Sequence, residues 1–418
     1  MPNRMPIWMS VQQGTRALRR RTGAALAAFT LTLGLALGLL GMAPPPAHAA
    51  TALPAIGDPD KVSISGISSG AAMAVQYAVA HSRTVTGVGA IAGPGWGCAQ
   101  GRISQAVNAC MCVRDAPPAT LHQARQFASA GAIDHLMSGR PQRLSRAFVF
   151  HSPDDATVKA AAGEVGMAFL RDFIGQPPTV DRGNASDGSD HAGHGILSPE
   201  GSDSCEAGLH DSSYVRHCGG KDNARDLLRA LFPDVPFDLG QRVDDIPDSE
   251  LQPFDQTPFI DEVTAASPYI APDTLWLSFW PYRSDRRDRL DMATTGYLYV
   301  PPVCRTAGTR CGVHVALHGC KQDVKAFART TGYKHWAQLY RLIIVYPAVK
   351  QSDQPVSESC AAGAVPTVAD SAWIQPNPNG CWDWWGYLDG NDRTRYLTQA
   401  APQMQVIERI VRALTRPQ

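Results

Sequence analysis

The sequence predicts an α/β fold with a mostly parallel sheet flanked by helices in a single domain. Short apolar runs rich in β-branched residues recur along the chain, and helical segments lie between them. Strands that alternate with helices in this way are typical of parallel sheets. The earliest run, at 61–65, leads through a glycine-rich turn directly into an apolar helical segment at 71–80. This strand-turn-helix unit supports the same architecture.

The turn between this strand and helix has the sequence Gly66-Ile67-Ser68-Ser69-Gly70. A Gly-x-Ser-x-Gly motif in this position indicates the nucleophile elbow of α/β-hydrolases, which holds a serine hydroxyl above the sheet. A side chain at either glycine would collide as the turn closes. Ser68 is therefore the candidate nucleophile, and the alternative is an ordinary glycine-rich turn.

Later segments extend the alternating pattern. We expect further strands at 86–91, 147–150, 295–300, 313–317 and 342–346, a helix at 223–231, and a loop at 181–204. Near the C-terminus, apolar residues from Met404 to Leu414 recur at helical spacing on one face, which predicts a closing helix. The stretch 233–290 is proline-rich and acidic, and we interpret it as a long connection between the two halves of the sequence.

The N-terminal segment, residues 1–49, has the pattern of a signal peptide. Four arginines between positions 16 and 21 precede an apolar stretch at 24–40, and Ala47-His48-Ala49 offers a small-x-small cleavage site. The apolar stretch is short for a membrane span, so an uncleaved anchor is the less favoured alternative. We expect an exported protein, secreted or periplasmic. Its mature chain, 50–418, should be one domain that is monomeric and has no membrane contact.

Ten cysteines, all beyond residue 49, support export, because exported proteins fold in oxidising compartments where cysteines pair. The expected disulfides join cysteines close in sequence: Cys98–Cys110, Cys205–Cys218 and Cys304–Cys311. A structural zinc site near Cys110 and Cys112 is the alternative, but the C-x-x-C spacing of such sites is missing. We therefore expect no metal and no cofactor. Equal numbers of basic and acidic residues, 38 each, give no reason to expect a nucleic-acid partner.

A nucleophilic serine needs a base and an acid that orients it. In α/β-hydrolases these follow in the chain order Ser, Asp or Glu, His. The expected acid is Asp155, just after a predicted strand, with Asp154 as its competitor. The expected base is His194, which has glycines on both sides, with His191 as the alternative. The aspartate that does not take part in catalysis would have a capping or turn role, and the histidine that does not would be a solvated loop residue.

An oxyanion hole requires backbone N–H groups directed at the developing negative charge. Ser69, the residue after the candidate nucleophile, should supply one. The other donor normally comes from a loop that follows a strand and often contains His-Gly. Here His318-Gly319-Cys320 follows the predicted strand 313–317, but it lies far after the serine rather than before it.

This order of motifs resembles the poly(3-hydroxybutyrate) depolymerases of the short-chain-length type with a permuted, type-2 catalytic domain. The similar segments are GISSG, SPDDATV, AGHG, LHGCKQ and NPNGCWDWWGY, which together span about residues 60–415. The resemblance implies a circularly permuted α/β-hydrolase. The strands at 295–300, 313–317 and 342–346 and the terminal helix would precede the elbow in an unpermuted enzyme. Chain ends that lie close together allow such an order within one domain.

The resemblance also implies roles for individual residues. It makes Ser68 the nucleophile, Asp155 the orienting acid and His194 the general base. The N–H groups of Ser69 and Cys320 would form the oxyanion hole. It further implies the disulfides Cys320–Cys381 and Cys112–Cys360. The aromatic residues Trp382, Trp384, Trp385 and Tyr387 would bind substrate in the cleft, with core packing as the alternative for each ring.

By this resemblance, the expected activity is that of a serine esterase that hydrolyses poly(3-hydroxybutyrate) or its oligomers through an acyl-enzyme intermediate. The alternative is a feruloyl, acetylxylan or tannin-type esterase that uses the same triad on plant-derived esters. A non-catalytic secreted polymer-binding protein is a third interpretation. The polarity of the cleft distinguishes the polyester esterase from the plant-ester esterase. Sugar esters require polar groups for their hydroxyls, and a polyester requires an apolar groove. No separate polymer-binding domain is expected within the sequence.

Overall fold

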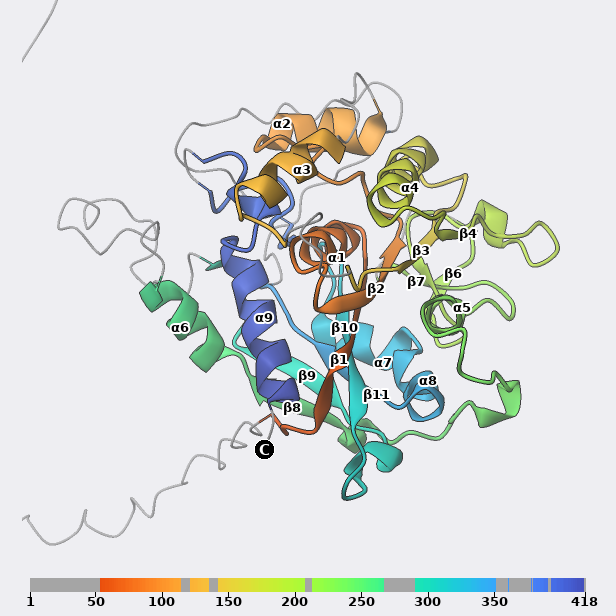
Figure 1. Cartoon of the computed structure of the whole chain (residues 1–418). Helices are drawn as coiled ribbons and strands as arrows, with labels where there is room; N and C mark the ends of the chain where they lie inside the picture. Colours follow the sequence, from red (N-terminus) through yellow and green to blue (C-terminus); the bar gives the residue numbers. More distant parts are fainter. Residues whose placement is uncertain are drawn as a thin grey trace, which may run out of the picture. The chain divides into compact units, whose positions relative to one another are not determined.

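An eight-stranded sheet forms the centre of the fold (Figure 1). The computed structural model describes residues 53–113, 121–134, 142–206, 213–266, 290–350, 360, 377, 379–389 and 392–416. The strands are β1 (Gly57–Ile67), β2 (Val85–Ile91), β3 (Arg146–Phe150), β4 (Thr179–Asp181), β8 (Leu251–Asp255), β9 (Thr295–Tyr299), β10 (Cys311–Leu317) and β11 (Leu342–Tyr346). Their order in the sheet is β4-β3-β2-β1-β10-β11-β9-β8. Only the β11–β9 and β9–β8 pairs are antiparallel, so the predicted mostly parallel sheet is confirmed.

The centre of the sheet joins strands that are far apart in sequence. β1 pairs in parallel with β10 from Val62 opposite Val313 to Gly66 opposite Leu317. Every residue of β10 and β11 is buried, as expected for strands covered on both faces. Because β1 and β10 run side by side in the same direction, the turn after β1 and the loop after β10 lie next to each other.

Helices cover both faces of the sheet (Figure 1). One face packs against α1 (Ser69–Ala80), α3 (Leu121–Ser129), α4 (Ala160–Ile174), α6 (Thr257–Ala266) and α9 (Pro402–Thr415). The other face packs against α5 (Asn223–Leu231), α7 (Val324–Thr330) and α8 (Tyr333–Tyr340). Smaller elements are α2 (Ile103–Gln105), a π-helical turn (Ala106–Cys110), and the short strands β5 (Ile196–Leu197), β6 (Asp203–Ser204) and β7 (Val215–His217). The two faces thus have separate hydrophobic cores.

The interpretation of 233–290 as a connection alone was wrong. Within it, β8 forms the edge of the sheet and α6 packs against α9. Leu251 and Phe254 of β8 are buried. The strand is hard to recognise because Pro253 interrupts it, and proline is tolerated there since β8 is an edge strand.

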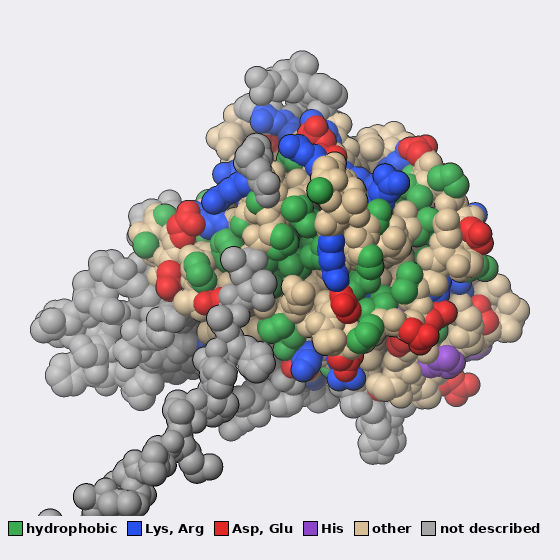
Figure 2. Space-filling model, turned by 90° about the horizontal axis from the view of Figure 1, so that it is seen from below, with side chains coloured by type: hydrophobic (Ala, Val, Ile, Leu, Met, Phe, Trp, Pro, Cys, Tyr) green, Lys and Arg blue, Asp and Glu red, His purple; other side chains and the backbone are tan. Residues whose placement is uncertain are grey.

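Five disulfides link all ten cysteines: Cys98–Cys110, Cys112–Cys360, Cys205–Cys218, Cys304–Cys311 and Cys320–Cys381. The three short-range pairs and the two implied by the resemblance are all confirmed. The predicted signal peptide lies outside the described residues. In the described part of the chain, no helix has the length and apolarity that a membrane span requires. Acidic and basic side chains are interspersed with hydrophobic ones on the face shown in Figure 2.

A polar network is buried between β1, β10 and α8. Ser63 Oγ lies 2.8 Å from Nδ1 of His314, and Ser65 Oγ lies 2.8 Å from its Nε2. The Tyr333 hydroxyl is 2.7 Å from Ser65 Oγ. Burial lowers the pKa of His314 to about 3, so the imidazole is neutral and uses one nitrogen as donor and the other as acceptor.

We expect His314→Leu to lower the free energy of unfolding by about 3 kcal/mol, because it leaves buried serine hydroxyls without their partner. The double variant Ser63→Ala/His314→Leu should recover part of this loss, since one orphaned hydroxyl is then gone. Urea unfolding followed by circular dichroism measures both. Equal stability of wild type and His314→Leu would show that the network contributes nothing.

Candidate active site

Ser68 lies in the sharp turn between β1 and α1. Its φ is +56°, in the left-handed region that a serine rarely adopts. The Ser68 N–H donates to the carbonyl oxygen of Ile91 at 2.9 Å, and the Ser68 carbonyl accepts from the N–H of Ala72 at 3.0 Å. The neighbouring strand β2 and the first turn of α1 thus hold the strained residue in place.

Two glycines allow this turn to close. A Cβ added to Gly66 would lie 2.4 Å from the carbonyl oxygen of Gly70. A Cβ added to Gly70 would lie 2.3 Å from the carbonyl oxygen of His318, in the loop after β10. Both distances are far below van der Waals contact. The second one shows that the loop after β10 packs directly against the elbow.

Gly70→Ala should therefore destabilise the protein by about 3 kcal/mol, at the upper end of the cost of overpacking, because the added methyl meets backbone that cannot rotate away. Gly220→Ala is the matched control, since nothing lies within 4 Å of a Cβ at that position. Thermal unfolding should show a lower midpoint for Gly70→Ala and an unchanged one for Gly220→Ala. A Gly70→Ala protein that unfolds at the wild-type temperature would argue against this packing.

Asp155 and His194 form a buried pair. His194 Nδ1 lies 2.8 Å from Asp155 Oδ2, and the two residues are 6% and 1% exposed. The other carboxylate oxygen accepts the N–H groups of Thr157 and Val158, both at 2.9 Å. The pairing places the imidazole hydrogen on Nδ1, which leaves Nε2 able to accept a proton.

Neighbouring groups keep Asp155 ionised. Burial alone would raise its pKa, but His194 and His151, whose Nε2 lies 3.4 Å from the carboxylate, hold the pKa well below its usual range. Because the pKa is lower in the folded than in the unfolded state, the carboxylate stabilises the fold above about pH 4. This stabilisation is lost as the pH falls toward the lower pKa of the folded state. Because that pKa is low, the Asp155 side chain is a carboxylate at neutral pH.

Asp154 and His191 form a second pair with the same geometry. His191 Nδ1 lies 2.8 Å from Asp154 Oδ2, and the hydrogen bond to Asp154 raises the pKa of His191. The side chains of Asp154 and His191 are 54% and 63% exposed. Those of Asp155 and His194 are 0% and 7% exposed. The alternatives left open by the sequence therefore sort into one buried pair and one solvated pair.

A cavity at the end of β1 brings Ser68 and His194 into one wall. Including space open to solvent, it measures about 720 Å³. Most of the wall is apolar and is formed by Ile67, Pro94, Ile103, Ala106, Val107, Met111, Val158, Trp384 and Trp385. Ser68 and His194 thus face a mostly apolar cavity, whose other polar lining residues include Thr157, Tyr214 and Lys321.

The loop His318–Gln322 lies beside Ser68. A Cβ added to Gly319 would be 3.3 Å from Ser68 Cβ. The Gly319 N–H donates to Gln322 Oε1 at 2.5 Å. Among the described residues, the backbone N–H groups of Ser69 and Cys320 have no acceptor, and both residues line the cavity. Two such donors beside a nucleophile can bind an oxyanion.

The four predicted substrate-binding aromatics occupy two kinds of position. Trp384 and Trp385 line the cavity. Trp382 is fully buried, and its Nε1 donates to the carbonyl oxygen of His318 at 2.9 Å. The Tyr387 ring packs against Trp385 with centroids 4.9 Å apart, and its hydroxyl donates to a backbone carbonyl of the same loop at 3.0 Å. Trp382 and Tyr387 therefore support the loops around the cavity and do not line it.

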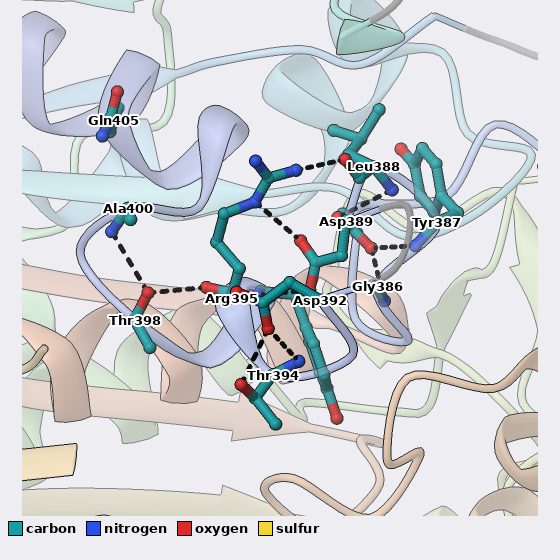
Figure 3. A network of polar contacts seen from close by, with 12 residues as sticks. Gly386, Tyr387, Leu388, Asp389, Asp392, Thr394, Arg395, Thr398, Ala400 and Gln405 are labelled. Atoms are coloured by element: carbon teal, nitrogen blue, oxygen red, sulfur yellow. Dashed lines mark hydrogen bonds and ion pairs between the residues drawn. The ribbon is translucent and has the colours of Figure 1, made fainter. Parts of the chain in front are cut away.

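A buried polar network holds the segment that follows the tryptophans (Figure 3). The Asp383 carboxylate accepts the N–H groups of Gly386 and Tyr387 at 2.7 and 2.9 Å, and burial raises the pKa of Asp383 to about 6. Arg395 Nε donates to Asp389 Oδ1 at 3.2 Å, and both residues are buried. Removing one partner of a buried ion pair is strongly destabilising, so this network fixes the loop.

Two residues that sequence reasoning missed support His194. The Tyr214 ring lies edge-on to the imidazole, with centroids 6.0 Å apart. Arg216 is fully buried, and its Nε donates to the carbonyl oxygen of His194 at 3.1 Å. A Cβ added to Gly195 would lie 2.9 Å from the Arg216 side chain. The glycine after His194 was the available signal, because it indicates a close approach there.

Two curated proteins match most of the chain. The poly(3-hydroxybutyrate) depolymerase of Delftia acidovorans is 29% identical over 388 residues, which cover 90% of this chain. The polyhydroxybutyrate depolymerase of Talaromyces funiculosus is 29% identical over 358 residues, which cover 82% of this chain and 87% of that protein. The chain resembles poly(3-hydroxybutyrate) depolymerases over most of its length. It spans 64% of the length of the Delftia acidovorans protein. No protein-family model matches it.

Two solved structures have the same fold. One is a PHB depolymerase from Penicillium funiculosum, with a TM-score of 0.63. The other is a PHB depolymerase variant complexed with an R3HB trimer, with a TM-score of 0.62. Each is 24% identical to this chain, and the superposition covers 87% of this chain and 99% of the other. The predicted α/β fold is therefore confirmed by known structures as well as by the strand order.

Proposed function

We propose that this protein is a serine esterase that hydrolyses poly(3-hydroxybutyrate), or its oligomers, through an acyl-enzyme intermediate. The observation that carries the proposal is a cavity whose wall contains both Ser68 and His194, with Asp155 buried behind the imidazole. The names of the two curated relatives supply the substrate class. Geometry supplies the reaction class, because this set of residues performs acyl transfer.

Each residue has one role in the proposed reaction. Ser68 Oγ attacks the ester carbonyl while His194 Nε2 accepts its proton, and Asp155 stabilises the resulting imidazolium. The N–H groups of Ser69 and Cys320 bind the oxyanion of the tetrahedral intermediate. His194 then gives the proton to the leaving alcohol. In the second half of the reaction it activates a water that hydrolyses the acyl-enzyme.

The cavity wall supports a polyester rather than a sugar ester. A hydroxybutyrate chain presents methyl groups and ester carbonyls, and it offers no donors except at its end. An apolar wall matches the methyl groups. The rings of Trp384 and Trp385 add to this apolar surface. Feruloyl, acetylxylan or tannin-type substrates carry many hydroxyls, which a mostly apolar wall matches less well.

Turbidity clearing tests the proposal. Purified mature protein should clear a suspension of poly(3-hydroxybutyrate), in amorphous or crystalline form, and release hydroxybutyrate oligomers. Release of ferulate or acetate from plant-derived esters, without clearing of either suspension, would favour the alternative esterase. Adsorption without any ester hydrolysis would favour the non-catalytic polymer-binding protein.

The remaining parts of the proposal concern the whole chain. We infer that residues 1–49 are removed on export and that 50–418 act as a single monomeric catalytic domain; the five disulfides are consistent with an oxidising compartment. The position of β10 beside β1 supports a circular permutation, since the strand that carries the second oxyanion donor comes late in the chain.

A further inference from the structure

The Gln322 side chain bridges two loops at the cavity. Gln322 lines the cavity and is 5% exposed. Its Oε1 accepts the N–H of Gly319 at 2.5 Å, and its Nε2 donates to the carbonyl oxygen of Ser213 at 2.6 Å. Gly319 belongs to the loop after β10. Ser213 precedes Tyr214, whose ring lies edge-on to His194. One amide therefore joins the oxyanion loop to the segment that packs against the base.

Chemistry fixes the orientation of this amide. The Gly319 N–H can only donate and the Ser213 carbonyl can only accept, so Oε1 and Nε2 cannot exchange places. Because Gln322 occupies the Gly319 N–H, that group is not available to an oxyanion. The next N–H along the chain, that of Cys320, has no acceptor within the described ranges.

We propose that Gln322 is a positioning residue for ester hydrolysis: it orients the Cys320 N–H toward the reacting carbonyl at Ser68 and fixes the oxyanion loop relative to the His194 side of the cavity. This inference rests on the proposed function. An oxyanion donor acts on the transition state more than on the bound substrate. Loss of its alignment should therefore lower kcat and leave KM nearly unchanged.

Two substitutions separate positioning from simple packing. Gln322→Met keeps the length of the side chain and removes both hydrogen bonds. Gln322→Glu keeps an acceptor for Gly319, but it places a carboxylate against the Ser213 carbonyl and beside the oxyanion. The matched control is Gln256→Met, because Gln256 is also buried and also bridges backbone groups, at 2.7 to 3.0 Å, without lining the cavity in the described part of the chain.

The experiment compares kcat, KM and the thermal midpoint of these variants with wild type, on a soluble p-nitrophenyl ester of butyrate. We expect Gln322→Met to lower kcat about 10- to 100-fold with KM within about threefold, as for misaligned oxyanion donors. Gln322→Glu should lower kcat by at least the same factor. Gln256→Met should lower the thermal midpoint and leave the kcat of the folded protein within twofold of wild type.

Wild-type kcat in folded Gln322→Met, or a change in KM alone, would overturn the inference. Should Gln322→Met fail to fold, Gln322→Glu decides in its place, and a folded Gln322→Glu with wild-type kcat would overturn it equally. An inactive wild-type protein would instead contradict the proposed function. The wild-type measurement thus distinguishes the two failures.

Discussion

Asp155→Asn should lower kcat for ester hydrolysis by about 10⁴-fold, the size of effect that this change has in another serine hydrolase. The asparagine side chain has nearly the same shape, but it can donate its NH₂ to Nδ1 of His194. The imidazole hydrogen would then move to Nε2, which could no longer accept the proton of Ser68. Steady-state hydrolysis of a soluble butyrate ester near neutral pH measures the loss.

Asp154→Asn is the matched control for this variant. Asp154 holds His191 at 2.8 Å, the same distance that separates Asp155 from His194, but the pair is exposed. We expect kcat of Asp154→Asn to stay within about twofold of wild type, because a solvated pair outside the cavity wall contributes little. The opposite result, with Asp154→Asn inactive and Asp155→Asn active, would reverse the assignment of the acid.

Ser68→Ala should lower kcat by about 10⁶-fold, as loss of the nucleophile does in a serine protease, and leave only the slow reaction that the cavity and oxyanion donors support. The fold should be unaffected, because the backbone bonds of Ser68 to Ile91 and Ala72 do not involve its hydroxyl. Circular dichroism and the thermal midpoint check folding, and adsorption to polymer should persist. A kcat of Ser68→Ala close to that of wild type would show that Ser68 is not the nucleophile.

Elements that depend on local pattern are well predicted from the sequence. The helix α5 at 223–231 and the strand β11 at 342–346 have the predicted bounds, because a clear helical period sets the first and a continuous apolar run sets the second. The edge strand β8 was missed for the converse reason. Although it is as long as β11, it contains Pro253 and buries only Leu251 and Phe254, so it has no continuous apolar run.

The candidate site was predictable in its residue types but not in its pairings. The sequence offers two adjacent aspartates and two nearby histidines, and only burial distinguishes Asp155 with His194 from Asp154 with His191. The same limit applies to the tryptophans at 382–385, since Trp382 is buried in the core while Trp384, two residues later, lines the cavity. The bridge made by Gln322 is a long-range contact that spacing does not reveal.

Covalent trapping of the nucleophile tests the central claim most directly. Purified protein would be incubated with a p-nitrophenyl alkylphosphonate, which transfers its phosphonyl group to an activated serine, and peptides would be analysed by mass spectrometry. We predict one adduct per chain, on Ser68, that is absent from Ser68→Ala and forms much more slowly in Asp155→Asn than in Asp154→Asn. An adduct on another residue, or one that persists in Ser68→Ala, would contradict the account.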